Sequence, residues 1–313
     1  MKAIILLEAG GVNNLLTTDI DRPQINESEV LVEVKAISIN PVDFKVRGAE
    51  HVLNMIYGEE RPAILGWDIS GVVVEKGSEV NNFEVGDRVF GMVNFVGKGK
   101  AYAEYVAAPS DQLAKIPEEV TFHSAAASTL AALTALQVLQ DKIKTDDRVL
   151  IHAGSGGVGH FAIQIAKSMG TRVITTSSTK NKELVLSFGA DQHIDYRKQA
   201  FEEMLSDVDF VFDMFNGDIL LKSIQVAKEG GTVFSIPTPD FTEEVKALAE
   251  EKNVNLQFHM VQSNGNDTQT IAGLLKNGAI KPHISKVFSF DEMRKAHEQL
   301  ESGRTVGKVI VTL

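Results

Sequence analysis

Short apolar runs separated by polar and turn-forming residues characterise the first hundred positions of the chain. Two such runs, at residues 30–36 and 69–74, are rich in β-branched side chains and are set apart by glycine and proline. Runs of this length and composition are typical of β-strands. The N-terminal part of the chain is therefore predicted to be mostly β-structure.

The pattern changes near Thr121, where longer helical stretches begin. Residues 124–139 consist mainly of strong helix formers and contain no helix breaker. They are predicted to form a helix. We expect a domain boundary just before this helix.

From Arg148 onward, short β-branched runs alternate with helical patterns. The runs lie at 149–152, 172–175, 208–212 and 232–236, and glycines stand where the intervening helices should end, at Gly170, Gly189 and Gly230-Gly231. Glycine is preferred just after the end of a helix. Strands that alternate with helices in this way indicate a parallel sheet with crossover helices.

The last fifty residues return to a mixed pattern. After about Asn264 we expect a helix, a strand at 286–290, a helix to Ser302 and a final strand that begins at Lys308. These elements are expected to rejoin the N-terminal β-structure. The predicted domains are therefore residues 1–120, completed by 264–313, and residues 121–263.

Composition narrows the class of protein. Of the 313 residues, 43% are hydrophobic, and no run approaches the roughly 20 apolar residues that a membrane span needs. The start of the chain reaches Glu8 after only five apolar positions, too few for a signal peptide. The net charge of −11 argues against a nucleic-acid partner. We therefore expect a soluble, cytoplasmic protein with a small-molecule partner.

The chain contains no cysteine. Disulfides, thiolate nucleophiles and zinc sites built on sulfur are therefore excluded. The eight histidines, at 51, 123, 152, 160, 193, 259, 283 and 297, are scattered without the close spacing of metal ligands. We expect no metal site. A hydrolase with a Gly-x-Ser-x-Gly nucleophile elbow is also excluded, because that motif is absent.

A glycine-rich turn carries the strongest functional signal. The residues Gly154, Ser155, Gly156, Gly157, Val158 and Gly159 fit the pattern G-x-G-x-x-G. An apolar strand leads into this turn, a helix predicted from Val158 to Met169 leaves it, and a second strand follows, as in dinucleotide-binding Rossmann folds. Such a turn brings backbone N–H groups to a pyrophosphate. The alternative is a structural turn that binds no ligand.

The residues after the second strand suggest which dinucleotide binds. Proteins that bind NAD place an acid there, about 20 residues past the turn, against the ribose 2′-hydroxyl. This chain has Ser177, Ser178 and Lys180 instead, which could hydrogen-bond and neutralise a 2′-phosphate. NADPH is therefore favoured over NADH. The alternative is that Ser178 or Thr179 only caps the helix that begins near Lys180.

Several motifs together resemble the medium-chain dehydrogenase/reductase superfamily, and within it the zinc-free branch of quinone oxidoreductases and alkenal reductases. They are the stretches 40–45 (NPVDFK), 65–73 (LGWDISGVV), 85–89 (VGDRV), 133–135 (LTA) and 303–308 (GRTVGK), besides the glycine-rich turn. The resemblance covers nearly the whole chain. It implies an α/β fold in which a GroES-like β domain lies beside a Rossmann domain with a doubly wound parallel sheet, and an active site between them.

The same resemblance shows where the chain departs from the zinc-dependent relatives. Those proteins use a cysteine where this chain has Asn40, and Gly-His-Glu where it has Gly66-Trp67-Asp68. They also carry a four-cysteine lobe, which is missing here. A zinc-type alcohol dehydrogenase is therefore disfavoured, although it would share the fold.

Without a metal, the simplest chemistry is hydride transfer from NADPH to an electron-poor acceptor, such as a quinone or an α,β-unsaturated carbonyl. We hypothesise that Lys45 lies near the nicotinamide ribose and stabilises negative charge on the acceptor oxygen. The resemblance also implies cofactor contacts for Lys45, Thr134 and Lys308. Asn40 and Asp43 are further catalytic candidates.

Each of these candidates has an ordinary structural alternative. Lys45 would then be an exposed lysine on a turn, and Thr134 a small residue in a packed helix. Asn40 and Asp43 flank a proline and would be turn residues for local reasons. At the level of the whole chain, the alternative is a structural or regulatory subunit that binds the cofactor without turnover.

The resemblance also suggests a homodimer. An exposed apolar edge strand needs to be covered, and the strand at 232–236 is the expected edge of the Rossmann sheet.

Overall fold

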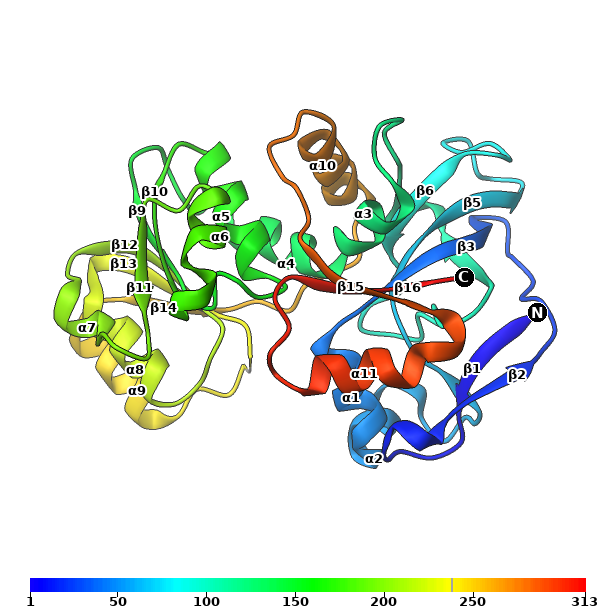
Figure 1. Cartoon of the computed structure of the whole chain (residues 1–313), viewed down its shortest axis with the longest axis horizontal. Helices are drawn as coiled ribbons and strands as arrows, with labels where there is room; N and C mark the ends of the chain where they lie inside the picture. Colours follow the sequence, from blue (N-terminus) through cyan, green and yellow to red (C-terminus); the bar gives the residue numbers. More distant parts are fainter. Residues whose placement is uncertain (238) are drawn as a thin grey trace. The chain divides into compact units, whose positions relative to one another are not determined.

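The computed structural model describes residues 1–237 and 239–313, which form two compact units. The first unit contains Met1–Leu133 and Val261–Leu313, and the second contains Thr134–Met260. Figure 1 shows the elements of both units in the colours of the sequence. None of the helices among the described residues has the length and apolar character that crossing a membrane requires.

The first unit is built on β-strands, as the sequence pattern predicts. A small antiparallel sheet has the order β2-β1-β4, and a larger sheet has the order β15-β16-β3-β5-β6-β8, with β7 paired to β3. The strands are β1 (Lys2–Leu6), β2 (Leu15–Asp19), β3 (Glu29–Ile39), β4 (Ala63–Ile64), β5 (Asp68–Lys76), β6 (Arg88–Met92), β7 (Tyr105–Pro109), β8 (Leu113–Lys115), β15 (Ile284–Ser289) and β16 (Lys308–Thr312).

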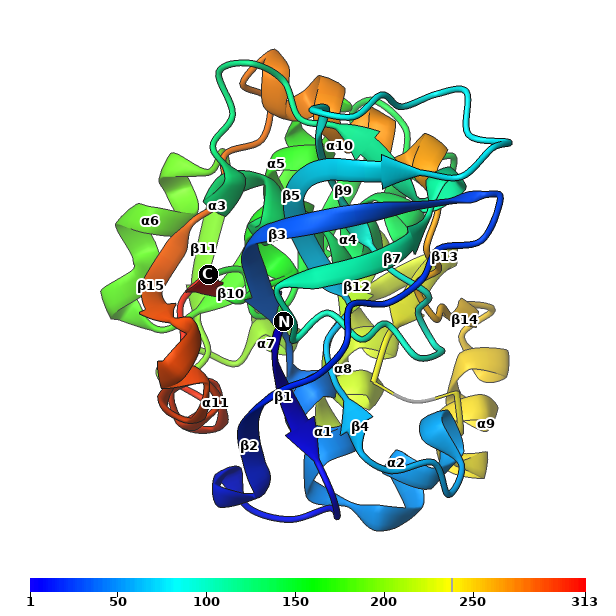
Figure 2. The ribbon, with the colours of Figure 1, turned by 90° about the vertical axis from the view of Figure 1, so that its right-hand side faces the viewer.

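Strand β3 organises the larger sheet. One of its edges pairs with β5, while the other is shared by β7, opposite residues 29–33, and β16, opposite residues 36–39. Figure 2 shows β3 as the long strand of the first unit, next to β5. The prediction that the C-terminal strand rejoins the N-terminal β-structure is therefore confirmed.

Helices cover the ends and one face of these sheets. They are α1 (Pro41–Gly48), α2 (Glu50–Tyr57), α3 (Phe122–Ala127), α10 (Gly265–Lys276) and α11 (Met293–Glu301), with short 3-10 turns η1 (Val12–Asn14), η2 (Ser110–Gln112) and η4 (Phe290–Glu292). Helix α4 (Leu130–Leu139) contains residues of both units.

The units differ from the predicted domain ranges at residues 121–133 and 261–263. Helix α3 explains the first difference, because its Ala126 and Ala127 are buried against Ala36 of β3 and Ile310 of β16. This helix therefore packs with the β-rich unit, although its sequence has the same helical character as α4, the next helix along the chain.

The second unit is a doubly wound parallel sheet with the order β11-β10-β9-β12-β13-β14. Its strands are β9 (Arg148–Ile151), β10 (Arg172–Ser177), β11 (Gln192–Asp195), β12 (Val208–Asp213), β13 (Ala227–Ser235) and β14 (Asn255–Phe258), and all their pairings are parallel. Its helices are α5 (Gly159–Ser168), α6 (Lys182–Ser187), α7 (Phe201–Met204), α8 (Asp218–Val226) and α9 (Glu243–Glu251), with the turn η3 (Thr179–Asn181). This is the Rossmann arrangement that the alternating pattern predicts.

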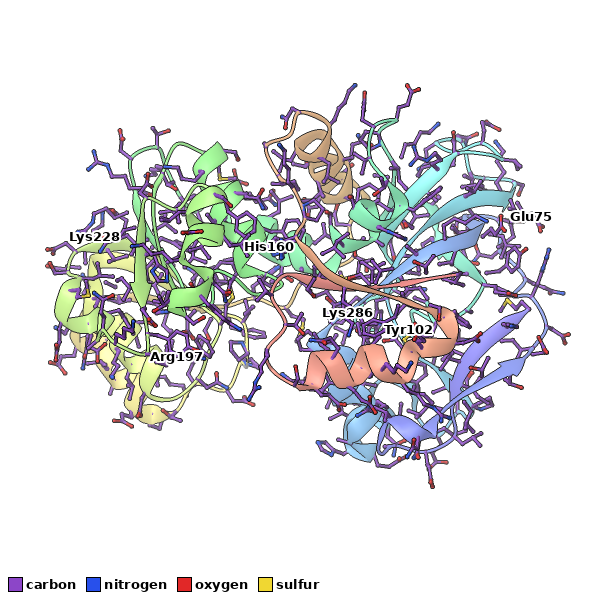
Figure 3. The ribbon with its side chains drawn as sticks, viewed as in Figure 1. Glu75, Tyr102, His160, Arg197, Lys228 and Lys286 are labelled. Carbon is purple, nitrogen blue, oxygen red and sulfur yellow. The ribbon has the colours of Figure 1, made fainter. Side chains whose placement is uncertain are left out.

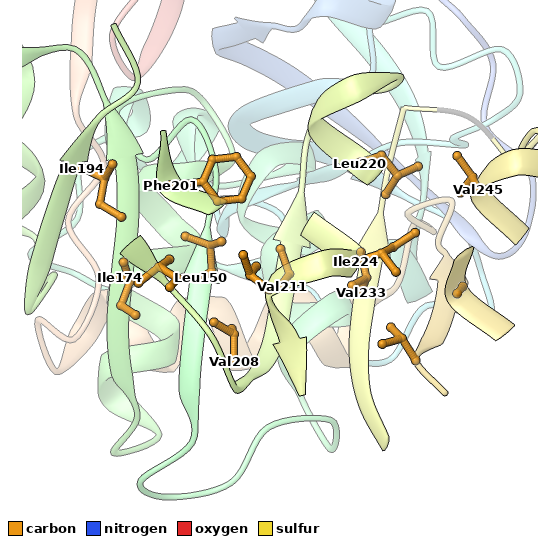
Figure 4. Close-up of a cluster of buried hydrophobic side chains, with 14 residues drawn as sticks. Leu150, Ile174, Ile194, Phe201, Val208, Val211, Leu220, Ile224, Val233 and Val245 are labelled. Atoms are coloured by element: carbon orange, nitrogen blue, oxygen red, sulfur yellow. The ribbon is translucent and has the colours of Figure 1, made fainter. Parts of the chain in front are cut away.

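Helices cover both faces of this sheet. Figure 1 shows α5 and α6 on one side and α7, α8 and α9 on the other. On the second side, buried residues of neighbouring strands, such as Leu150 and Val211, pack with Leu220 and Ile224 of α8 (Figure 4). A strand covered on both faces is apolar at nearly every position, which explains the short continuous apolar runs in this part of the sequence.

The prediction of an edge strand at 232–236 is wrong. Residues 232–235 belong to β13, which pairs with β12 on one side and with β14 on the other. The edges of the sheet are β11 and β14. The backbone groups of β13 are satisfied by β14, a strand that the sequence analysis did not anticipate.

Candidate active site

The glycine-rich turn connects β9 to α5, as predicted. A side chain at Gly154 would place its Cβ 2.0 Å from Thr175 Oγ1, and one at Gly159 would place it 2.3 Å from the Ala153 carbonyl oxygen. Ala153 itself has a φ of 49°, in the left-handed region. The turn is therefore too tight for any residue but glycine at these two positions.

Backbone N–H groups of the turn are available for a ligand. Within the part of the chain that the structure describes, the amides of Ser155, Gly157 and Val158 have no hydrogen-bond partner. They precede the ten-residue helix α5, whose dipole places partial positive charge at this end. Free amides, a positive helix end and a turn without Cβ atoms fit the pyrophosphate of a dinucleotide.

His152, which directly precedes the turn, is held by two hydrogen bonds. Its Nδ1 lies 3.1 Å from Thr176 Oγ1 and its Nε2 lies 3.0 Å from Ser223 Oγ. Because the Ser223 hydroxyl donates its proton to the Ile219 carbonyl, Nε2 must be the protonated nitrogen. Burial lowers the pKa of His152 to about 4, so the ring is neutral at neutral pH.

Thr176 completes this support. Its hydroxyl donates to His152 Nδ1 and accepts a hydrogen bond from the Ala153 N–H, at 3.3 Å. Its carbonyl oxygen accepts from the Gly154 N–H at 3.0 Å. The first two residues of the turn are therefore fixed to β10.

The residues at the end of β10 occupy the predicted place. Lys180 is exposed on η3, whereas Ser177 and Ser178 are buried. Ser178 directly precedes η3 but its side chain makes no capping hydrogen bond, which argues against the capping alternative. The Asn181 amide donates to Ser155 Oγ at 2.8 Å, so this segment is joined to the glycine-rich turn.

An acid does lie beside this segment, on the next strand. Asp195 ends β11 and is in register with Ser177. One carboxylate oxygen accepts from the Thr179 hydroxyl and the other from the Arg197 N–H. These hydrogen bonds hold the pKa of Asp195 below its usual range. Figure 3 labels Arg197, which lies just beyond this strand in the sequence.

In the first unit, a cluster of buried polar side chains surrounds Asn40. The Asn40 amide donates to Asp68 Oδ2 at 2.8 Å, and its oxygen accepts from the Lys308 ammonium. Lys308, only 3% exposed, lies 3.9 Å from Asp68 Oδ2. The other Asp68 oxygen accepts from the Leu130 N–H at the start of α4. Residues far apart in the sequence therefore form one charged cluster.

Asp43 belongs to the same neighbourhood. Its Oδ2 accepts from the Asn40 N–H at 2.6 Å, as in a helix-capping box. Burial raises the pKa of Asp43 to about 7, and the negative charge of Asp68 adds to this. The Asn40 N–H, the Tyr102 hydroxyl and the Lys308 ammonium act in the opposite direction.

Tyr102, which is also buried, contacts helix α11. Its hydroxyl lies 3.0 Å from His297 Nε2, and Figure 3 shows Tyr102 beside this helix. His297 Nδ1 lies 3.4 Å from a guanidinium nitrogen of Arg47, which can only donate. Nδ1 is therefore the acceptor, and the proton sits on Nε2, facing Tyr102.

Comparisons with known proteins agree with this architecture. The family model for the alcohol dehydrogenase GroES-like domain matches residues 26–118, and that for zinc-binding dehydrogenases matches residues 188–311. The chloroplastic NADPH-dependent alkenal/one oxidoreductase of Arabidopsis thaliana is 33% identical over 325 residues, covering 99% of this chain and 79% of its own. The chain belongs to the medium-chain dehydrogenase/reductase superfamily.

Solved structures of this superfamily resemble the chain over its full length. The quinone oxidoreductase of Coxiella burnetii has a TM-score of 0.93 and 37% identity, covering 100% of this chain and 99% of its own. The Escherichia coli quinone oxidoreductase, solved in complex with NADPH, has a TM-score of 0.88 and 26% identity, with both chains fully covered. This chain is accordingly an oxidoreductase of the medium-chain dehydrogenase/reductase superfamily.

The residues at the superfamily's zinc positions do not fit the metal. Both polar atoms of Asn40 are engaged, by Lys308 and Asp68, and the Trp67 indole N–H donates to the Gly97 carbonyl. In residues 1–237 and 239–313, no three His, Asp or Glu side chains are grouped so that they could hold a metal ion. The Lys308 ammonium is the positively charged group that contacts Asn40 and Asp68 in this cluster.

The remaining candidates stay predictions. Lys45 is exposed on α1, on the opposite side from the buried Asp43 and Arg47, and it has no hydrogen-bond or ion-pair partner among the described residues. Thr134 is 5% exposed within α4. Lys308 is enclosed by protein groups of its own unit, which leaves its ammonium little freedom for the cofactor contact that the resemblance implies.

Besides Asp195, sequence reasoning missed four side chains that support these sites: His152, Asp68, Tyr102 and His297. Only His152 carried a usable signal, because it directly precedes the glycine-rich turn. The other three are brought to their positions by strand pairing and helix packing.

Proposed function

We propose that this chain is an NADPH-dependent reductase of quinones or α,β-unsaturated carbonyls that works without zinc. The observation that carries the proposal is the glycine-rich turn, with its free amides, followed by Ser177, Ser178 and Lys180 at the end of β10. Relatives named as NADPH-dependent alkenal/one oxidoreductase and quinone oxidoreductase support it.

The second unit supplies the cofactor site in this proposal. The amides of Ser155, Gly157 and Val158 bind the pyrophosphate, and the N-terminus of α5 adds partial positive charge. The Lys180 ammonium binds the 2′-phosphate, with the adjoining serines as further contacts. Asp195, the acid on the neighbouring strand β11, already accepts hydrogen bonds from the Thr179 hydroxyl and the Arg197 N–H.

The first unit supplies the residues that act on the acceptor. When bound, NADPH supplies a hydride to the acceptor. Lys45 stabilises the negative charge that develops on the acceptor oxygen. Asn40 and Asp43 define the start of α1, the helix that carries Lys45, and thereby orient it. Thr134 contributes a further cofactor contact from α4.

Zinc independence is part of the proposal. It is supported by the amide of Asn40 and the indole of Trp67 at the positions where zinc-dependent relatives have ligands, and by the hydrogen bonds that occupy both groups. Preparations treated with a chelator should therefore keep full activity.

The test follows NADPH absorbance in parallel reactions with a quinone, a short enal and no acceptor. Acceptor-dependent oxidation of NADPH is the expected result, unchanged by the chelator. If NADPH binds but no acceptor consumes it, the chain is a cofactor-binding subunit, and the proposal fails. Loss of activity on chelation would refute zinc independence alone.

A cytoplasmic location and a homodimer also remain predictions. If the Rossmann sheet pairs with a second copy, the strands that offer an unpaired edge are β11 and β14, since β13 is enclosed. Sedimentation would measure the oligomeric state directly.

A further inference from the structure

The winding of the second unit changes direction between β9 and β12. From β9 the chain proceeds to β10 and β11 on one side, and from β12 to β13 and β14 on the other. In parallel sheets of this kind, ligands bind at the carboxyl ends of the strands where the direction changes. Asp213 is the last residue of β12, and the His152 N–H donates to the Phe212 carbonyl just before it. Asp213 therefore lies at this switch point.

The Asp213 side chain is only partly satisfied. It is 0% exposed, and its Oδ2 accepts from the Ser235 hydroxyl and the Phe215 N–H, both at 3.2 Å. Its Oδ1 has no hydrogen-bond partner among the described residues. A buried acceptor without a partner destabilises a protein, so we expect a donor that the described residues do not supply. The Ser235 hydroxyl and the Phe215 N–H both donate to Asp213, and such hydrogen bonds favour the ionised form of a carboxyl group.

No charged side chain is paired with Asp213 within the described residues. His152, from the adjoining strand β9, is neutral because burial lowers its pKa to about 4. Strand β13 contributes only the Ser235 hydroxyl. On α8, which packs against β12, Lys222 pairs with Glu202, and Asp218 is exposed. Burial without a compensating charge raises the pKa of Asp213 to about 7.

We propose that Asp213 Oδ1 accepts a hydrogen bond from a ribose hydroxyl on the nicotinamide half of the bound dinucleotide. The inference rests on the proposed function, which places NADPH on the glycine-rich turn. In the proposed function, Lys180 and the serines at the end of β10 bind the 2′-phosphate, so the adenosine half of the dinucleotide lies on the β10 side of the switch point. The other half must then cross the switch point onto β12 and β13, where Asp213 and Ser235 end their strands.

The chemistry of the site favours a hydroxyl over the other groups of the cofactor. A phosphate oxygen would be repelled by the carboxylate, and an apolar ring face would leave Oδ1 unpaired. A neutral O–H donor satisfies the acceptor and stabilises its ionised form. Binding should therefore lower the pKa of Asp213 and release protons to solvent near pH 7.

Calorimetry in two buffers of different ionisation enthalpy measures this release on the unmodified protein. At pH 7, NADPH should release on the order of half a proton more than 2′,5′-ADP, because a group of pKa about 7 is half protonated there. The fragment 2′,5′-ADP has the adenosine half with its 2′-phosphate and lacks the nicotinamide ribose. It therefore corrects for the titration of the 2′-phosphate, and its own 5′-phosphate adds little because a group of pKa about 6 is mostly ionised at pH 7.

Variants test the assignment independently. Asp213→Asn should abolish the difference in proton release and weaken NADPH about tenfold to a hundredfold, with 2′,5′-ADP unchanged. Lys180→Ala should weaken both ligands alike. Asp209→Asn is the matched control, since Asp209 is on the same strand but pairs with Lys228 and the Arg148 N–H. It should leave both affinities unchanged.

The outcomes separate the inference from the proposed function. If NADPH fails to bind, the proposed function fails first. If NADPH binds but releases no more protons than 2′,5′-ADP, the inference is overturned, whether or not Asp213→Asn folds. Equal weakening of both ligands by Asp213→Asn would also overturn it, because Asp213 would then act on the turn or the adenosine half.

Discussion

The two units build their candidate sites in opposite ways. In the second unit, the glycine-rich turn offers backbone amides, and its shape depends on the absence of side chains at Gly154 and Gly159. In the first unit, the cluster around Asn40 consists of side chains that neutralise and hydrogen-bond one another. The turn in the second unit depends on steric fit, whereas the cluster in the first unit depends on charge balance. The two should therefore fail under different perturbations.

The largest effect on cofactor binding is expected at the turn. Gly154→Ala places a Cβ 2.0 Å from Thr175 Oγ1, so the turn must move away from β10. We expect NADPH affinity to fall by about a hundredfold or more, measured by fluorescence titration. Gly273→Ala is the control, since a Cβ there meets nothing within 4 Å and lies in helix α10. It should add roughly 0.5–1 kcal/mol of stability without changing affinity.

Substitutions in the cluster around Asn40 should mainly change the stability of the protein. Lys308→Met leaves the buried carboxylate of Asp68 without its cation, and should lower the free energy of unfolding by about 3–5 kcal/mol. Adding Asp68→Asn removes the uncompensated charge, so the double variant should recover part of this loss. Urea unfolding measures both. If the double variant is no more stable than Lys308→Met, charge balance does not hold the cluster together.

Asp43 should make the free energy of unfolding depend on pH. Its folded pKa, about 7, lies above the unfolded value near 3.9, so the folded state loses stability as the pH rises from about 4 through 7. Asp43→Asn lacks this ionisation. The stability of the variant relative to the parent should rise by roughly 2–4 kcal/mol over that interval and then level off. Denaturant titrations at several pH values measure this difference in stability between the variant and the parent. If it stays constant with pH, the pKa of Asp43 is not raised in the folded state.

The smallest effect is expected at Lys180, because exposed ion pairs are weak. Lys180→Ala should weaken NADPH about tenfold and leave NADH nearly unchanged, as measured by their dissociation constants. Lys182→Ala is a matched control two residues away, at the start of α6. Equal losses for NADPH and NADH would remove Lys180 from the 2′-phosphate site.

The same contrast explains what could be predicted from the sequence. The turn was recognisable because its residues are contiguous and its flanking strand and helix have clear patterns. Asp68 and Lys308 are 240 positions apart and meet only because β5 and β16 both pair with β3, a register that no local pattern specifies. Asp195 was missed for a similar reason, since it reaches Ser177 through the pairing of β10 with β11.

The error at the edge of the Rossmann sheet has a different cause. Strand β14 has the sequence NLQF, with exposed residues alternating with half-buried ones, and it is too short and too polar to be recognised as a strand. Overlooking it left β13 as the apparent edge. An edge strand exposed to solvent carries a weaker apolar pattern than the central strands that it borders.

The pairing of β16 with β3 also affects the order in which the two units can fold while the chain is being synthesised on the ribosome. Residues 36–39 emerge early, but their partner on one edge is the strand Lys308–Thr312, which is made after the whole second unit. The second unit, by contrast, is one continuous stretch and has all its strands once Phe258 has emerged. Since domains fold as units during translation, the inserted unit can fold first. The strand that organises the larger sheet would meanwhile keep part of its edge unpaired, until residues 308–312 have emerged.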